Sequence, residues 1–348
     1  MNATDAATPG RALCVLLAIA VAGLAGWGAL ALWFQVPWPW PLRTLLIVGW
    51  CALGLGAILS LAGRSAPLLR WTFGIVFLVL LGWWSTLEPS HGRDWADDVA
   101  RLVEAEVDGD RVTLHNVRNF DLRTETDYTP RWETRSYDLD KLVSADLILS
   151  YWMGPHIAHT LVSFGFDDGR QLVFSLEIRK ERHESFSAIG GFFREFEQVM
   201  IAADERDIVR TRSNARGEDV YLYRLRMGQP QLRALFLGYI DSAAELRRMP
   251  EFYNSLTSNC TTIIFELARQ IAPALPLDYR LLLSGYFAGY AYDQGGLTPR
   301  YDYARLQALG HINARALATD AQADDPLAFS RVIRRGVPGI PEEDQADE

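Results

Sequence analysis

The chain contains a cysteine, Cys260, in a polar stretch (SLTSNCTT, 255–262) directly before an apolar run that predicts a helix. At a helix N-terminus the unpaired backbone N–H groups and the helix dipole stabilise a thiolate and lower its pKa below ~8.5. The same N–H groups can hold an oxyanion. Most free cysteines are small buried core residues, but the polar neighbours favour a nucleophile here, with Asn259 as a substrate or oxyanion contact and Thr261 and Thr262 as helix caps.

A cysteine nucleophile needs a base, and histidine is the usual one. Three of the six histidines lie beside the apolar N-terminal region, in a charged run or near the C-terminal end. His115, His156 and His159 are the internal alternatives. His156 and His159 have opposite parity, so on an extended chain they face opposite sides of the strand.

The segment FDDGRQ, between two predicted strands, sets the surroundings of His159. A three-residue loop at 167–169, with its glycine in the left-handed conformation, places His159 opposite Glu177, with Ser175 on the same face. A two-residue loop would place His159 opposite Ile178 instead. A polar cluster on an otherwise apolar hairpin is costly unless satisfied or used. We therefore predict His159 as the base, Glu177 as its orienting group and Ser175 as a substrate or oxyanion contact, the alternative being a structural histidine.

Three apolar runs at the N-terminal end, residues 13–34, 44–63 and 71–87, carry no charged side chain. Their lengths predict three transmembrane helices rather than buried core helices or a signal peptide. Arg11 precedes the first run, and Arg64 and Arg70 lie between the second and the third, whereas only Arg43 lies between the first and the second. Because basic residues are enriched on the cytoplasmic side of a membrane, this distribution favours a cytoplasmic N-terminus. The remainder of the chain would then lie in the periplasm of a Gram-negative bacterium, anchored in the inner membrane by a multi-pass segment.

The positions of the three cysteines predict no disulfide bonds, because Cys14 and Cys51 lie in different apolar runs and Cys260 lies in the polar part of the chain. Cys260 would thus be a single thiol in an oxidising compartment, which is a liability unless the thiol has a use. The spacing of His, Cys, Asp and Glu predicts no metal site. A net charge of −9 and the lack of a phosphate-binding motif favour neither a nucleotide cofactor nor nucleic acid.

The chain of 348 residues divides by composition into three parts. Residues 1–87 form the membrane anchor, 88–318 the periplasmic domain and 319–348 an acidic flexible tail. Alternation predicts strands at 111–116, 147–151, 158–166, 171–179 and 219–226, and helical spacing predicts helices at 229–249 and 261–272. Strands followed by helices indicate an α+β domain. The arginines of 124–135 and 207–219 could bind phospholipid phosphates, but surface ion pairs with the nearby acidic side chains are expected instead.

Six segments in the same order resemble the Lnb N-terminal periplasmic domain family: RDW (93–95), NVRNFDLRTETDY (116–128), HTLVSFGF (159–166), ADERD (203–207), RGEDVYLYRL (216–225) and FYNSLTSNCTT (252–262). The resemblance implies a circularly permuted relative of the NlpC-type and papain-like thiol enzymes. It places the nucleophile at Cys260 and the base at His159.

Named members of that family are bacterial lipoprotein N-acyltransferases, so the resemblance implies acyl transfer through a cysteine thioester, with phospholipid and lipoprotein as substrates. Two alternatives remain open from the residues. The same cysteine and histidine serve a thiol hydrolase, such as a protease, amidase or lipid hydrolase. A non-catalytic envelope protein that binds a lipid or a peptide is the third reading.

Overall fold

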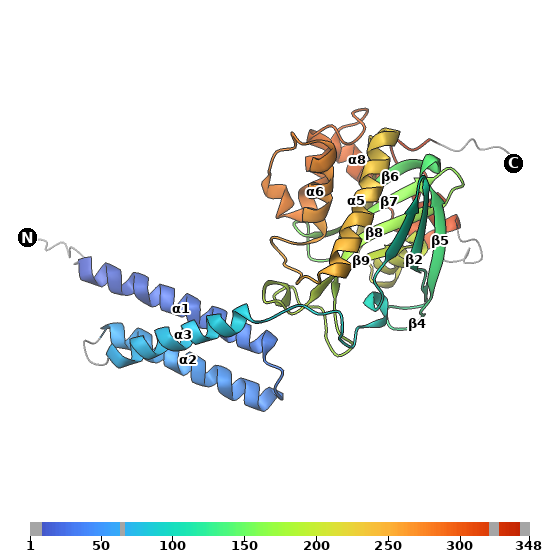
Figure 1. Cartoon of the computed structure of the whole chain (residues 1–348). Helices are drawn as coiled ribbons and strands as arrows, with labels where there is room; N and C mark the ends of the chain where they lie inside the picture. Colours follow the sequence, from blue (N-terminus) through green and yellow to red (C-terminus); the bar gives the residue numbers. More distant parts are fainter. Residues whose placement is uncertain (1–8, 63–66, 320–326, 342–348) are drawn as a thin grey trace, which may run out of the picture. The chain divides into compact units, whose positions relative to one another are not determined.

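The computed structural model describes residues 9–62, 67–319 and 327–341, and the chain divides into two compact units (Figure 1). The first unit combines residues 1–90 with the short segment 187–195. The second combines residues 91–186 with 196–348.

Three long apolar helices make up most of the first unit: α1 (Pro9–Gln35), α2 (Trp40–Ala62) and α3 (Pro67–Ser85). Each is long and apolar enough to cross a membrane. Trp50 of α2 stacks on Phe73 of α3, with ring centroids 5.0 Å apart, and its indole N–H donates to the Ala25 carbonyl of α1 at 2.8 Å. The three predicted apolar helices are confirmed, and most of their apolar surface remains exposed, as lipid-facing helices require.

The second unit is built on an eight-stranded sheet with the order β1-β2-β9-β8-β7-β6-β10, in which β5 also pairs with β2. All neighbours are antiparallel except β2 and β9. The strands of this sheet are β1 (Glu104–Asp108), β2 (Arg111–Arg118), β5 (Trp132–Asp138), β6 (Leu142–Tyr151), β7 (Ala158–Phe166), β8 (Gln171–Arg179), β9 (Glu197–Ala203) and β10 (Asp219–Arg224). A separate pair is formed by β3 (Asp121–Leu122) and β4 (Tyr128–Thr129).

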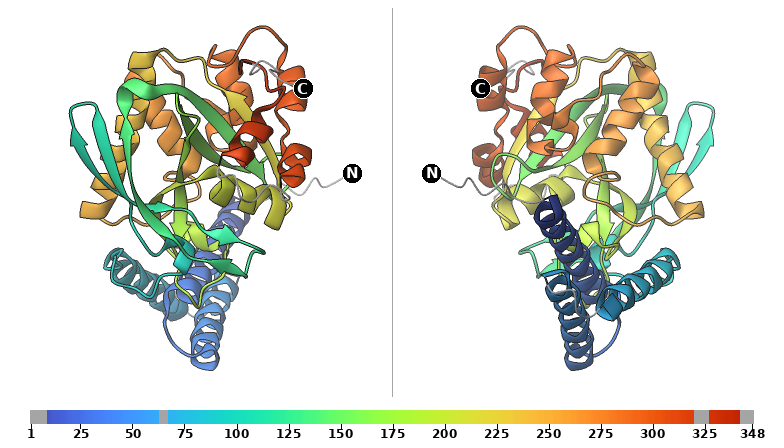
Figure 2. Two further views of the ribbon diagram at one scale, coloured as in Figure 1. Left: turned by 90° about the vertical axis from the view of Figure 1, so that its right-hand side faces the viewer. Right: turned by 90° about the vertical axis from the view of Figure 1, so that its left-hand side faces the viewer.

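Helices cover both faces of this sheet (Figure 2). One face packs against α5 (Gln229–Arg248), α6 (Cys260–Ile271) and α7 (Phe287–Asp293). The other packs against α4 (Glu205–Arg210), α9 (Asn313–Ala318) and α10 (Ala328–Arg334), while α8 (Tyr303–Gly310) contributes Leu306 to the first core. Strand alternation divides the side chains: Val162 and Phe164 of β7 enter the first core, and Leu161 enters the second. The predicted mixed α and β domain is confirmed.

The β7–β8 turn has the predicted three-residue form. Gly169 adopts a positive φ of 84°, and the Phe166 N–H donates to the Arg170 carbonyl at 3.0 Å. The paired register runs from Gly165 opposite Gln171 to Val162 opposite Phe174 and stops there, although both strands continue. The two strands therefore have the predicted register near the turn, but residues 158–161 of β7 are not paired with residues 175–178 of β8.

The C-terminal region corrects one expectation. Residues 319–348 were expected to form a flexible acidic tail, but α10 packs on the sheet with Phe329 and Ile333 buried. Its Arg334 donates to the buried carboxylates of Asp146 at 2.7 Å and Glu205 at 2.6 Å. Burial of these apolar and paired charged groups fixes the helix, whereas residues 320–326 and 342–348 of the expected tail lie outside the described residues.

Candidate active site

The turn before α6 is held by Asn259, which is the N-cap of the helix. Its Oδ1 accepts hydrogen bonds from the Thr261 and Thr262 N–H groups at 2.9 and 3.1 Å. Thr262 Oγ1 in turn accepts from the Asn259 N–H at 2.8 Å, which completes a capping box. The expectation that Thr261 and Thr262 are the caps is wrong, because Asn259 has the extended backbone that an N-cap needs.

The Asn259 Nδ2 donates to the Ser255 carbonyl at 2.9 Å. The Asn259 contacts orient the turn that carries Cys260, and the role of Asn259 as a substrate or oxyanion contact stays a prediction. The first residue of α6 is Cys260, so the cysteine N–H stands at the positive end of the helix dipole.

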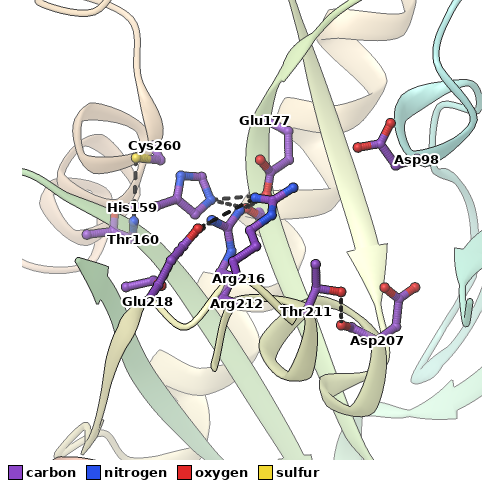
Figure 3. Close-up of polar contacts among 12 residues, drawn as sticks. Asp98, His159, Thr160, Glu177, Asp207, Thr211, Arg212, Arg216, Glu218 and Cys260 are labelled. Atoms are coloured by element: carbon purple, nitrogen blue, oxygen red, sulfur yellow. Dashed lines mark hydrogen bonds and ion pairs between the residues drawn. The ribbon is translucent and has the colours of Figure 1, made fainter. Parts of the chain in front are cut away.

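Cys260 is buried, with 6% of its surface exposed, and its sulfur accepts a hydrogen bond from the Thr160 N–H at 3.5 Å. The Thr160 and Thr261 hydroxyls lie 3.1 Å apart and join β7 to α6 at the same point. The nucleophile candidate is thereby fixed beside the strand that carries His159 (Figure 3).

His159 lies between Cys260 and Glu177 (Figure 3). Its Nε2 is 2.7 Å from Ser175 Oγ and 3.1 Å from Glu177 Oε1. Ser175 Oγ donates to the same Glu177 oxygen at 2.7 Å. These partners hold the Nε2–H tautomer, which leaves Nδ1 for Cys260. The structure therefore brings together Cys260, His159, Ser175 and Glu177, as the hairpin register predicts for the last three.

A second layer of charge supports Glu177. Arg212 Nη2 donates to Glu177 Oε1 at 2.8 Å, and its Nη1 lies 3.4 Å from Glu218 Oε2. Glu218 also accepts from the Ser150 hydroxyl of β6. Within the described part of the chain, Arg212 Nε is a buried donor without a partner.

The expectation of surface ion pairs in 207–219 is wrong for Arg212, which is only 6% exposed. It lies in a π-helical turn, Thr211–Ala215, immediately after α4. No periodic pattern marks such a turn in the sequence, and the pairing depends on a strand far away in the chain. The signal that could have found it is the partly buried Glu177 on a largely apolar strand, because such a carboxylate is stabilised by a cation in addition to His159.

The electrostatics favour a thiolate–imidazolium pair. Burial raises the pKa of Cys260, but His159 and the Thr160 hydrogen bonds outweigh it and lower the pKa to about 7. Burial and Arg212 lower the pKa of His159, yet Glu177 and Cys260 raise it to about 9. Burial raises the pKa of Glu177, whereas His159 and Arg212 hold it well below its usual range. Between pH 7 and 9 the charged pair therefore predominates.

The other internal histidines lie elsewhere. His115 of β2 contacts Glu106 at 3.2 Å and Thr134 at 3.1 Å at the surface of the domain. His156 Nδ1 contacts the Tyr286 hydroxyl, also at the surface. In the described residues no three His, Cys, Asp or Glu side chains are grouped to hold a metal ion. The constellation at Cys260 is thus suited to nucleophilic catalysis with an adjacent base.

Comparison with known families agrees with the sequence resemblance. Residues 128–285 match the model of the Lnb N-terminal periplasmic domain, and this range includes Cys260, His159, Ser175, Glu177 and Arg212. No curated protein and no solved structure matches the chain. Together with the three apolar helices, the match supports a membrane-anchored protein with a periplasmic domain.

Proposed function

We propose that this Lnb-type domain is a cysteine-dependent acyltransferase that N-acylates lipoproteins at the periplasmic surface of the bacterial inner membrane. The observation that carries the proposal is the grouping of the buried Cys260, at the N-terminus of α6, with the partly buried His159 and Glu177 of β7 and β8. The arrangement contains a nucleophile, a base and an orienting carboxylate, as covalent acyl transfer requires. A papain-like permutation of the domain is part of the proposal.

In the first half-reaction the Cys260 thiolate attacks the carbonyl carbon of a phospholipid ester. The tetrahedral oxyanion is stabilised by the Cys260 N–H at the start of α6, where the helix dipole is positive, since the Thr261 and Thr262 N–H groups donate to Asn259. His159 then donates its proton to the departing alcohol oxygen, so that the C–O bond breaks and a Cys260 thioester remains. Glu177, 3.1 Å from His159 Nε2, keeps the imidazolium charged until that transfer.

In the second half-reaction the α-amine of a lipoprotein's N-terminal cysteine attacks the thioester. His159, now neutral, accepts the proton lost by the amine, and the C–S bond breaks to give an amide and the Cys260 thiolate. The starting thiolate–imidazolium pair is thereby restored. No cofactor takes part in either step.

The membrane anchor supports lipid substrates, because a lipid donor and a lipidated acceptor both reside at the bilayer surface. Tethering raises the effective concentration of both at the site. The three apolar helices support a multi-pass anchor, and the excess of Arg11, Arg64 and Arg70 over Arg43 favours a cytoplasmic N-terminus. Transfer of the same acyl group to water would use the same residues and give a hydrolase.

The test is product analysis with the purified full-length protein in phospholipid nanodiscs and a diacylated lipopeptide. We expect an N-acylated peptide from the wild type and none from Cys260→Ala or His159→Ala, since nucleophile and base act as a unit. His115→Ala, which removes a surface histidine, is the matched control and should retain activity. Free fatty acid without N-acylated peptide would assign a hydrolase, and no product of either kind would overturn the enzymatic proposal.

A further inference from the structure

The segment Ser187–Glu195 is part of the connection between β8 and β9, residues 180–196, yet it packs as part of the unit formed by α1, α2 and α3. The chain therefore passes between the two units at three places, one after residue 90 and one at each end of this segment. A plain connection between two antiparallel strands needs only a few residues. This longer connection has contacts of its own that point to a ligand.

The contacts are made with the ends of α1 and α3. Gln35, the last residue of α1, donates from Nε2 to the carbonyls of Phe193 at 2.8 Å and Arg194 at 2.7 Å. The Phe193 ring stacks on Phe34 with centroids 5.7 Å apart. The Arg194 guanidinium lies 4.9 Å over the Trp84 ring and donates to the Trp84 carbonyl at 2.8 Å.

These contacts place the segment at one end of the membrane-spanning helices. Phe34 and Trp84 each lie one residue before the end of their helices, α1 and α3. Aromatic and arginine side chains at this level are typical of the membrane–water interface, where an apolar body and a polar tip are both satisfied. Because successive membrane crossings run in opposite directions, the C-terminal ends of α1 and α3 lie on the same side of the membrane.

Two large apolar side chains of the segment are left exposed beside these anchors: Ile189 is 54% and Phe192 is 42% exposed. In contrast, the adjacent Phe193 is only 8% exposed. Ile189 is the N-cap and Phe192 the last residue of the short 3-10 turn Gly190–Phe192, whose glycines give the backbone room to fold back. In water, such exposure would be unfavourable.

We propose that residues 187–195 form a lipid-contacting segment in which Ile189 and Phe192 enter the headgroup–acyl boundary, about 5–10 Å deep, beside α1 and α3. The bilayer is the occupant because the neighbouring Phe193 and Arg194 pack on the ends of α1 and α3, helices that are long and apolar enough to cross a membrane. This inference does not depend on the acyltransferase proposal. If residues 187–195 contact lipid, the connection that follows β8 is bound to the membrane. Strand β8 carries Ser175 and Glu177.

The test is fluorescence quenching with the full chain in phosphatidylcholine–phosphatidylglycerol nanodiscs. Cys14, Cys51 and Cys260 are replaced by alanine, and a single cysteine at Phe192 or Ile189 carries an environment-sensitive nitrobenzoxadiazole label. The matched control is Val143→Cys, an exposed apolar position (57%) on β6 of the other unit. Each labelled protein is first shown to retain the melting temperature of the unlabelled cysteine-free chain.

We expect labels at positions 189 and 192 to emit at shorter wavelength than the label at 143. Lipids with a nitroxide near the headgroup should quench them strongly, those with the nitroxide near the end of the acyl chain should quench them weakly, and the Val143 label should respond little to either. Equal quenching at all three positions would overturn the proposal. Two positions are used so that a local distortion at one of them does not decide the result.

Discussion

Replacing Glu177 by glutamine should raise the pKa of Cys260. The Glu177 carboxylate raises the pKa of His159 against burial and against the Arg212 cation, which both lower it. Without the carboxylate, His159 is neutral near pH 7 and no longer stabilises the thiolate. In the wild type the thiol pKa falls from 9.0 to about 7, which corresponds to roughly 3 kcal/mol in favour of the thiolate.

The size of the effect follows from these values. A thiol with a pKa near 7 is about half ionised at pH 7, and one with a pKa near 9 is about 1% ionised, so the variant should react roughly 10- to 50-fold more slowly at pH 7. The loss should shrink as the pH rises, because the thiol then ionises without help. The midpoint of the rate profile therefore moves to higher pH by up to about 2 units.

The assay is the rate of Cys260 alkylation by iodoacetamide from about pH 5 to pH 10, read by peptide mass spectrometry, with Cys14 and Cys51 replaced by alanine. Glu106→Gln is the matched control, because it removes the carboxylate beside a different histidine, His115, at 3.2 Å. An unchanged rate profile in Glu177→Gln would refute the reasoning and remove Glu177 from the site. A change of equal size in Glu106→Gln would show that the effect is not local.

Three further variants test the supports of the site. Arg212→Met removes the buried cation between two partly buried carboxylates, Glu177 and Glu218, and should lower the free energy of unfolding measured with urea by up to about 3–5 kcal/mol; an unchanged free energy would be the contrary result. Asn259→Ala should cost about 1 kcal/mol by loss of the helix cap, whereas Asn259→Asp should restore most of it. Arg334→Met should destabilise the domain by about 3–5 kcal/mol but leave the Cys260 alkylation profile unchanged; a shifted profile would link the two polar clusters.

The sequence predicted what depends on local patterns. Strand alternation located β7 and β8 with the observed bounds, and the DDG turn set the register that brings His159 to Glu177. The polar residues 255–262 around Cys260 indicated the start of a helix, because Ser, Thr and Asn are the residue types preferred at a helix N-cap. The three long N-terminal helices were likewise predicted from local composition, because each corresponds to an uncharged apolar run long enough to cross a bilayer.

What the sequence did not predict depends on contacts between distant residues. Arg212 reaches Glu177 from a π-helical turn, which has no periodic signature. Arg334 looked like part of an acidic tail, and only the folded sheet presents Asp146 and Glu205 to it. The packing of 187–195 with the membrane helices likewise requires the folded chain, since nothing local distinguishes this segment from an ordinary strand connection.

The most direct measurement of the central claim is the intact mass of the purified protein after incubation with phospholipid alone. The account predicts an acyl-sized mass increase on Cys260 that hydroxylamine removes, that disappears when lipopeptide is added, and that is absent from Cys260→Ala and His159→Ala. A wild-type protein whose mass never changes, although a small alkylating reagent labels Cys260 readily near pH 7, would contradict the thioester mechanism.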